Sequence, residues 1–134
     1  MTLSRVDRMR AAYEAYNTGG LGSGDELISD DIEVRPSATS LEPEPFHGRE
    51  ALLRYLEPNL FEFQRAEPVE FLEEGDRVLV TVRVHARGRG SGVELRNEAF
   101  HLWTVEDELA VMFEMFLDRD EALAALRRQA PPTG

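Results

Sequence analysis

The sequence predicts an α+β domain in which N-terminal helices pack against a highly curved sheet, antiparallel or mixed, that wraps around them and encloses a pocket. Two patterns support this fold class. In the N-terminal part, apolar residues recur at three- and four-residue steps, as on amphipathic helices, and from position 68 they alternate with polar residues, as on strands. Helices followed by a meander of long antiparallel strands leave the helices on one face of the sheet, which gives a cone-shaped domain.

The first predicted element is a helix that ends near Asn17. Ser4 is placed to cap it and Asp7 follows three residues later, while the apolar stripe consists of Val6, Met9, Tyr13 and Tyr16. We expect both tyrosines to be core residues first, with hydroxyls that reach the cavity or solvent. The glycine-rich GGLGSG then predicts a flexible connection before a short helical turn over residues 25–29.

A short strand and a second helix are predicted next. Residues 31–35 alternate as a strand, after which Pro36, Pro43 and Pro45 keep the chain extended as far as His47. Beyond Gly48 a second amphipathic helix, ended or bent by Pro58, presents the stripe Leu52, Leu53, Tyr55 and Leu56.

The C-terminal half predicts strands and one closing helix. Val69 and Phe71 lead into a turn over residues 74–76, and the second strand of this hairpin carries the alternating Val78, Val80, Val82 and Val84. The remaining elements are a long strand over 93–105, which follows a glycine-rich connection, a turn over 106–108, a last strand that contains Glu114, and a helix over 118–128.

Length and residue usage limit the class of protein. A chain of 134 residues suits a single domain, expected over residues 1–130, with 131–134 as a disordered tail. There are no cysteines, which excludes disulfides and cysteine zinc sites and fits a cytoplasmic protein. The histidines, His47, His85 and His101, show no ligand spacing, so we expect neither a metal nor a cofactor.

The charge of the chain excludes further classes. The formal net charge is −11, and every basic residue is an arginine, scattered and mostly beside acids, so nucleic acid is not an expected partner. No segment has the apolar length of a signal peptide core or a membrane span, and we expect no membrane partner.

Several segments together resemble the SnoaL-like branch of the nuclear-transport-factor-2-like superfamily, which also contains ketosteroid isomerase. They are YEAYNTGGL, SDDIEVRP, FHGREALLRYL, GRGSGVELRNEAFHLWTV and MFLDRDEALAAL. The resemblance implies the cone-shaped fold, a homodimer formed through the sheet, and cofactor-independent isomerase, cyclase or hydrolase chemistry or else non-catalytic binding. We also expect the exposed sheet face to carry enough apolar area for that homodimer.

The resemblance places candidate residues on this chain. His101 is similar to a histidine of the cyclases and is the expected catalytic residue, since an unperturbed imidazole titrates near physiological pH. Alternation puts His101 on one strand face with Asn97, Ala99 and Trp103. The expected pocket residues besides His101 are Tyr16, Arg35, Asn97, Trp103, Phe113 and Met115.

Other positions differ from the family's chemistry. Arg35, before Pro36, stands where ketosteroid isomerase has its general base, and Glu98 lies near that enzyme's carboxylic acid. We expect Arg35 and Glu98 to pair across the cavity mouth. The alternatives are that they bind an anionic ligand group or that Glu98 acts as an acid or base. The last-strand carboxylate of the cyclases falls here at Met115, whose thioether moves no proton.

Glu114 is the only charged residue in the apolar run LAVMFEMFL and needs an explanation. It is paired, has a raised pKa in a pocket, or lies on a face that meets solvent or a partner chain. Because neighbouring strand residues point to opposite faces, we expect it on the outer face, at a dimer contact or paired with an arginine such as Arg83 or Arg96; the alternative is an acid or base.

Two functions follow as hypotheses. The first is a domain whose apolar pocket holds a small hydrophobic metabolite, with His101 as the polar contact and with or without acid/base catalysis. The second is a non-catalytic dimeric scaffold or binding module, in which large side chains fill the cavity as plain core.

Overall fold

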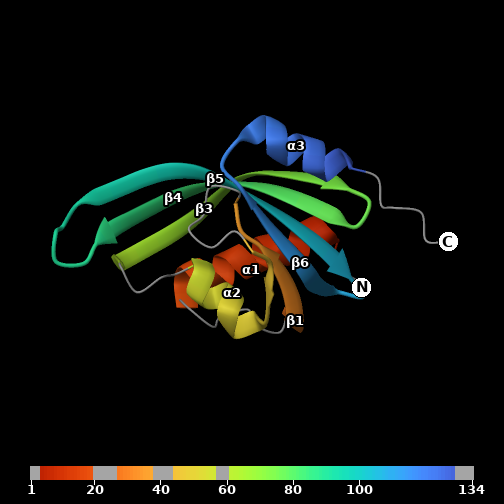
Figure 1. Cartoon of the computed structure of the whole chain (residues 1–134), viewed down its shortest axis with the longest axis horizontal. Coiled ribbons are helices and arrows are strands. Elements are labelled where there is room, and N and C mark those ends of the chain that lie inside the picture. The colour runs from red at the N-terminus through yellow and green to blue at the C-terminus, as the bar shows by residue number, and fades with distance from the viewer. Residues whose placement is uncertain (1–3, 20–26, 38–43, 57–60, 129–134) are drawn as a thin grey trace.

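The computed structural model describes residues 4–19, 27–37, 44–56 and 61–128. Within these residues the chain forms helices α1 to α3 and strands β1 to β6 (Figure 1). In chain order they are α1 (Arg5–Gly19), β1 (Ile28–Arg35), β2 (Phe46–His47), α2 (Arg49–Leu56), β3 (Phe61–Glu74), β4 (Arg77–Gly88), β5 (Glu94–Glu106), β6 (Leu109–Phe116) and α3 (Arg119–Arg127). The predicted α+β class is confirmed.

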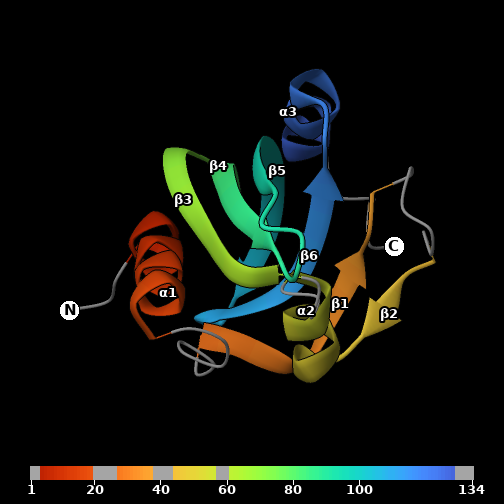
Figure 2. The same ribbon diagram turned by 90° about the vertical axis from the view of Figure 1, so that its left-hand side faces the viewer.

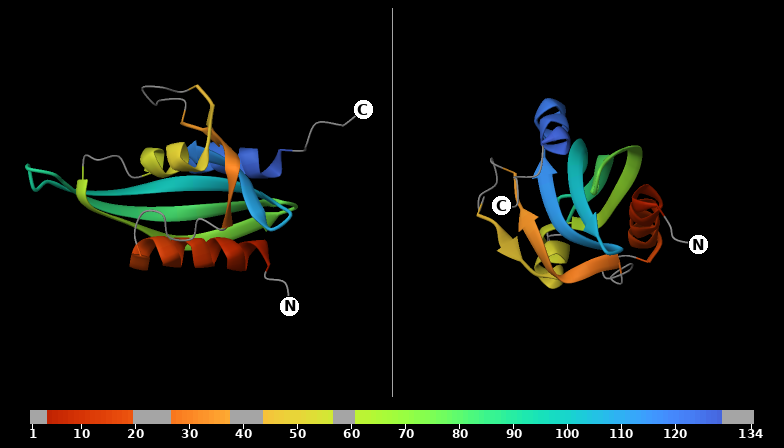
Figure 3. Two further views of the ribbon diagram at one scale, coloured as in Figure 1. Left: turned by 90° about the horizontal axis from the view of Figure 1, so that it is seen from below. Right: turned by 90° about the vertical axis from the view of Figure 1, so that its right-hand side faces the viewer.

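The strands form one mixed sheet in the order β2-β1-β6-β5-β4-β3. Neighbouring strands run antiparallel except β1 and β6, which run parallel. The sheet curves around α1 and α2, and α3 lies on its opposite, outer side (Figures 1 and 2). The right-hand view of Figure 3 shows the same division from the other end of the molecule. The curvature therefore gives the sheet a concave inner face that two helices cover.

Helix α1 is fixed at both ends. The Ser4 hydroxyl accepts the backbone N–H of Asp7 at 3.0 Å, as the cap predicted. Near the other end, the Asn17 amide donates to the carbonyl oxygen of Ala66 at 2.7 Å and accepts its N–H at 3.1 Å. These two hydrogen bonds to β3 orient the helix so that Met9 and Tyr13 are buried against the sheet.

Two apolar cores lie on the two faces of the sheet. The inner core, between the concave face, α1 and α2, includes Ile32, Val34, Leu52, Trp103, Phe113 and the alternating Val78, Val80 and Val82. The outer core, beneath α3, consists of Leu79, Phe100, Leu102, Ala122, Ala125 and Leu126. Odd and even positions of β4 thus serve different cores, as the period of two predicts.

Tight turns connect the long strands. Gly75 has a φ of +61° between β3 and β4, within the predicted turn over 74–76. Between β5 and β6, both Asp107 (φ +49°) and Glu108 (φ +71°) are left-handed. A two-residue loop with positive φ at both positions matches the right-handed twist of the strands it joins.

Some predicted boundaries are wrong. The helical turn predicted over 25–29 is wrong for its last two residues, because β1 already begins at Ile28, which is buried and pairs in parallel with Ala110. Strand β3 begins at Phe61 rather than near position 68, because its ladder with β4 continues as far as Gly88. Residues 25–26, Pro43, Pro58 and the tail at 131–134 lie outside the described residues.

The outer face beyond α3 is charged rather than apolar. Glu67, Arg83 and Glu98 align across β3, β4 and β5 and are exposed. Arg65, His85 and Arg96 form the neighbouring row. The apolar area expected for a homodimer is therefore absent from these described rows, and the homodimer stays a prediction. No helix of the described residues is long and apolar enough to span a membrane.

Glu114 lies on the outer face, beneath the end of α3. Its carboxylate, 6% exposed, accepts a hydrogen bond from the half-exposed Arg128 guanidinium at 3.0 Å. The position of Glu114 on the outer face and its pairing with an arginine agree with the prediction, but the predicted partners, Arg83 and Arg96, are wrong. Glu114 is in register with Leu102, whereas Arg83 is in register with Glu98, about 13 Å further along β5.

The C-terminal end of α3 is held by a second arginine. The Arg77 guanidinium of β4 donates to the carbonyl oxygens of Ala125 and Leu126, both at 3.4 Å, and to that of Arg128. Cations suit this end of a helix because the last carbonyls lack partners within it. Arg77 and Glu114 together attach the end of α3 to the sheet.

Replacing Arg128 with leucine leaves the buried Glu114 carboxylate without its cation. We expect the free energy of unfolding, measured in urea, to fall by roughly 1–3 kcal/mol. The same substitution at the exposed neighbour Arg127 should change it by less than about 0.5 kcal/mol. Equal losses for the two variants would contradict the role of the pair, and Glu114→Leu added to Arg128→Leu should recover part of the loss.

Candidate functional site

A cavity of about 270 Å³ lies between α1, α2 and the concave face of the sheet. Its lining is contributed by both helices and five strands and is mostly apolar. The lining residues are Ala12, Tyr13, Tyr16, Ile28, Leu53, Tyr55, Leu56, Ala66, Val84, Ala86, Leu95, Asn97, Ala99, His101, Trp103 and Met115. This volume is close to the lower limit of ordinary ligand sites.

Strand β5 forms one wall of the cavity along its whole length. Five alternate residues of this strand line it, and the exposure of their side chains falls along the strand. Leu95 and Asn97 are exposed, whereas Ala99, His101 and Trp103 are 6%, 4% and 4% exposed. The cavity therefore has an open end near Asn97 and a closed end at His101 and Trp103.

Three side chains form a hydrogen-bonded chain at the closed end. The indole N–H of Trp103 donates to the Tyr13 hydroxyl oxygen at 2.9 Å. The same oxygen lies 2.6 Å from Nδ1 of His101. All three side chains are buried away from water, so these two bonds supply partners that their polar atoms would otherwise lack.

Chemistry fixes the donor in the bond between Trp103 and Tyr13, and the hydrogen-bonding capacity of the Tyr13 hydroxyl favours one direction for its contact with His101. An indole nitrogen only donates, so the Tyr13 oxygen accepts from Trp103 and keeps one proton of its own to donate. Nδ1 of His101 is the acceptor within reach of that proton. In neutral His101 the ring proton then lies on Nε2.

Aromatic packing holds these rings in place. The Tyr13 and His101 rings are stacked with centroids 5.9 Å apart. Phe113 lies 5.0 Å from the His101 ring and 4.7 Å from the Trp103 ring. Because Phe113 is completely buried, it fixes both rings from behind and does not itself line the cavity.

Burial decides the protonation states at the closed end. It lowers the pKa of His101 from 6.5 to about 3, because the charged imidazolium loses its hydration. It also raises the pKa of the Tyr13 hydroxyl, and the bond from Trp103 offsets only part of this shift. At neutral pH both groups are therefore uncharged, and His101 does not titrate near physiological pH as an unperturbed imidazole does.

The described lining residues include no carboxylate and no arginine. Nor do the described residues contain a group of three or more histidine, cysteine or acidic side chains that could hold a metal ion. The polar side-chain atoms of the described lining belong to His101, Asn97, Trp103 and the tyrosines Tyr13, Tyr16 and Tyr55. Such a surface can bind a neutral molecule by apolar contact and a few hydrogen bonds.

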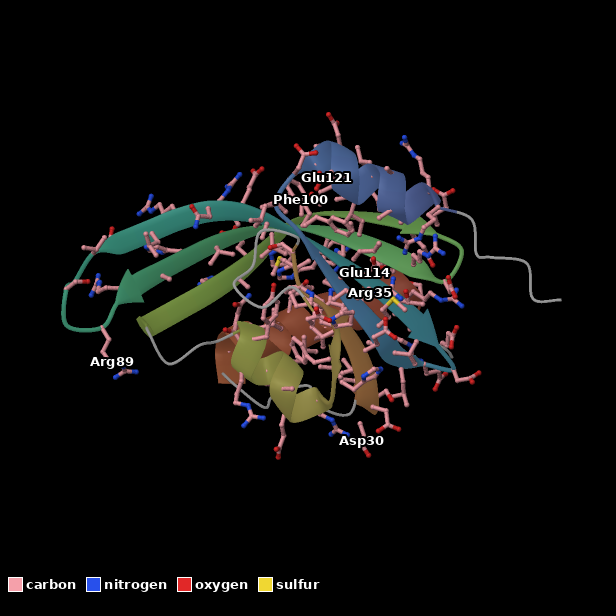
Figure 4. All side chains as sticks on the ribbon, viewed as in Figure 1. Asp30, Arg35, Arg89, Phe100, Glu114 and Glu121 are labelled. Carbon is pink, nitrogen blue, oxygen red and sulfur yellow. The ribbon has the colours of Figure 1, made fainter. Side chains whose placement is uncertain are left out.

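The structure brings five of the candidate residues together and separates the others. Tyr16, Asn97, His101, Trp103 and Met115 line the cavity. Arg35 does not, since it lies on the face of β1 opposite the buried Val34 and bonds Glu33 at 2.5 Å. Figure 4 shows Arg35 beside Glu114, its register partner on β6. Phe113, also expected to line the cavity, lies behind its wall.

Glu98 likewise does not reach the cavity. It is exposed on the outer face of β5, in register with Arg83, so the expected pairing with Arg35 across the cavity mouth is wrong. Alternation along β5 accounts for the error, because Asn97 and Ala99 on either side of Glu98 face inward.

Met115 is in register with His101 on the neighbouring strand. A carboxylate at this position would lie beside the imidazole, whereas the thioether adds only apolar contact. Glu114 faces the outer core through the opposite side of β6 and does not replace the missing acid. Neither alternative acid or base, Glu98 or Glu114, lies in the cavity.

The sequence did not predict that Tyr13 would join His101 and Trp103 by hydrogen bonds. Its place on the apolar stripe of α1 predicts burial, which the structure confirms, but a stripe position does not reveal a bond to β5. The contact with His101 spans 88 residues of sequence. The one available signal was that a buried tyrosine needs a hydrogen-bond partner, and His101 and Trp103 were buried polar candidates.

Comparisons with known proteins agree with this architecture. Residues 9–113 match the sequence profile of the SnoaL-like domain. No curated protein sequence matches the chain significantly.

Three solved structures are similar to the chain at low identity, which bears on the fold alone. An NTF2-like protein of unknown function from Burkholderia pseudomallei is 22% identical, with a TM-score of 0.70 over 92% of this chain and 97% of that one. IdmH, a putative polyketide cyclase from Streptomyces antibioticus, is 22% identical, with a TM-score of 0.67 over 90% and 96%. TerC, co-crystallised with polyporic acid, is 21% identical, with a TM-score of 0.70 over 90% and 95%.

Replacing Tyr13 with phenylalanine removes the hydroxyl that joins Trp103 and His101. We expect the free energy of unfolding to fall by roughly 1–3 kcal/mol, because two buried polar groups lose their partner. Urea unfolding measures the loss. Tyr55→Phe, which removes a half-buried hydroxyl bonded to the Ser37 backbone, is the control and should cost less. A Tyr13→Phe variant as stable as the wild type would contradict the hydrogen-bonded chain.

The lowered pKa of His101 predicts a pH dependence of stability. Between pH 6.5 and about 3 the unfolded chain binds a proton at this residue that the native state does not, so native stability falls as the pH falls. The slope from one such group is at most about 1.4 kcal/mol per pH unit. The stability of the wild type should therefore fall relative to that of His101→Gln as the pH is lowered from 6.5 to about 3, so the advantage of the wild type in unfolding free energy shrinks. A difference that is independent of pH would show that His101 titrates normally.

Proposed function

The chain belongs to the SnoaL-like family, and from the cavity on the concave face of its sheet we propose that it binds a neutral, hydrophobic small molecule. The observation that carries this proposal is the character of the lining. Most of it is aliphatic or aromatic, and its described residues contribute no ionic group at neutral pH. Apolar burial thus supplies the affinity, while a few hydrogen bonds orient the ligand.

The lining favours binding over carboxylate-based proton transfer. General acid/base catalysis needs a group that holds or takes a proton near the working pH. His101 has a pKa of about 3, and the position beside it is Met115. If the protein catalyses a reaction, we infer that neutral His101 takes part as a hydrogen-bond donor rather than as an imidazolium acid.

A purely structural scaffold has less support. Such a protein would fill the space between helices and sheet with large side chains, whereas here alanines occupy four lining positions, on α1, β3, β4 and β5. These are Ala12, Ala66, Ala86 and Ala99. Small side chains on four elements leave volume that a ligand can occupy. That TerC was crystallised with polyporic acid makes ligand binding in this fold a reasonable expectation.

Thermal unfolding in the presence of 2-acetylnaphthalene tests the proposal. A ligand at 100 times its dissociation constant stabilises the native state by about 2.7 kcal/mol, which raises the melting temperature by several degrees. We expect this rise for the wild type and its loss in Ala99→Leu, which fills the cavity. Ala124→Leu makes the same change on the exposed face of α3 and should keep the rise. An equal rise in both variants would contradict binding in this cavity.

A further inference from the structure

We propose that the closed end of the cavity recognises an uncharged oxygen acceptor on the ligand, such as a ketone or ester carbonyl, through the Nε2–H of His101. In this proposal Tyr13 is a positioning residue, because its bond to Nδ1 determines which ring nitrogen carries the proton. The inference rests on the proposed function and names the chemical class that this site selects.

The first step is the direction of the hydrogen bonds. Trp103 donates to the Tyr13 oxygen at 2.9 Å, and that oxygen lies 2.6 Å from Nδ1 of His101. We assign the Tyr13 proton to this second contact, because Nδ1 is the acceptor that the described residues place beside it. The lone pair of Nδ1 is therefore occupied, and the neutral ring carries its hydrogen on Nε2. A group at this end of the cavity meets a donor on His101 and no free acceptor on it.

The second step concerns what else could take this hydrogen. The rings packed around His101 are those of Tyr13, Trp103 and Phe113, and the residue in register on β6 is Met115. Among the described residues, none accepts a hydrogen bond from Nε2. Since His101 lines the cavity, this N–H is the donor that it offers to a ligand. A buried donor of this kind gains free energy when an acceptor arrives.

The third step is the charge of the acceptor. The described lining residues include no arginine, so a carboxylate at the closed end would give up its hydration without a cation in return. An alcohol could accept from Nε2–H, but its own proton would then need an acceptor, and the Trp103 and Phe113 rings packed around His101 offer none. A carbonyl or ether oxygen accepts without bringing a proton, and it is the group that this environment favours.

The fourth step is the orientation of the ligand. Asn97 lies four residues before His101 on the same face of β5, about 13 Å away along the strand. Between them lies Ala99, and on β4 Val84 is in register with Asn97 while Ala86 lies one pair further toward the open end, in register with Leu95. A flat body can lie against these small and aliphatic side chains. The ligand therefore extends along β5, with its carbonyl at His101 and its other end beside the exposed Asn97.

The test compares two matched neutral probes in two proteins. 2-Acetylnaphthalene carries the acceptor, and 2-ethylnaphthalene replaces it with a hydrocarbon. His101→Phe keeps an aromatic ring but removes the donor. Calorimetry gives the ratio of the two dissociation constants in each protein. We expect the preference for the ketone to be about tenfold greater in the wild type than in His101→Phe, the value of one net hydrogen bond.

Two further measurements examine the neutral charge and the role of Tyr13. 2-Naphthoate should bind the wild type at least tenfold more weakly than the ketone does. Tyr13→Phe frees Nδ1 and allows either tautomer, so the preference for the ketone should fall toward that of His101→Phe. Thr81→Val removes a buried hydroxyl on the opposite face of β4 and should keep the wild-type preference.

The outcomes separate this proposal from the proposed function. Both neutral probes binding with the same preference in the wild type and in His101→Phe would overturn the acceptor proposal while leaving ligand binding intact. Tighter binding of 2-naphthoate than of the ketone would overturn the selection for a neutral group. Failure of all three probes to bind the wild type would overturn both the proposed function and this inference.

Discussion

The Tyr13 hydroxyl connects the two layers that form the cavity. It bonds Trp103 and His101 of β5 from a helix that lies across the concave face, at distances of 2.9 and 2.6 Å. The indole N–H of Trp103, the Tyr13 hydroxyl and Nδ1 of His101 satisfy one another without water, so the sheet can bury these polar atoms at the closed end of an apolar cavity. The polarity of the closed end and the proposed tautomer of His101 depend on this contact, which holds α1 to the sheet together with the bonds of Asn17 to Ala66.

The curved sheet separates its carboxylates from the residues that line the cavity. Alternation assigns every second residue of β5 to the cavity and the residues between them to the outer face, where Glu98 is exposed. The same rule separates Met115, beside His101, from Glu114, which bonds Arg128 beneath α3. Glu98 and Glu114 therefore lie on the outer face, while the inner face remains apolar and suited to a neutral ligand.

Sequence periodicity predicts the parts of the fold that depend on local spacing. It identifies α1 and its Ser4 cap, α2, the β3–β4 hairpin and α3, and it places Asn97, His101 and Trp103 on one face. It does not predict contacts between distant elements, such as Tyr13 with His101 or Arg128 with Glu114. Arg35 was misplaced because a match to a family position does not show the face of β1 to which its side chain points.

The claim on which the binding mode depends is that neutral His101 carries its proton on Nε2. A long-range ¹H–¹⁵N NMR spectrum of the imidazole rings measures this directly, in the wild-type protein between neutral pH and about pH 5, well above the pKa of His101. The expected result is one protonated nitrogen, Nε2, and an Nδ1 that accepts a hydrogen bond, with no change across that range. A proton on Nδ1, or a doubly protonated ring within the range, would contradict the claim.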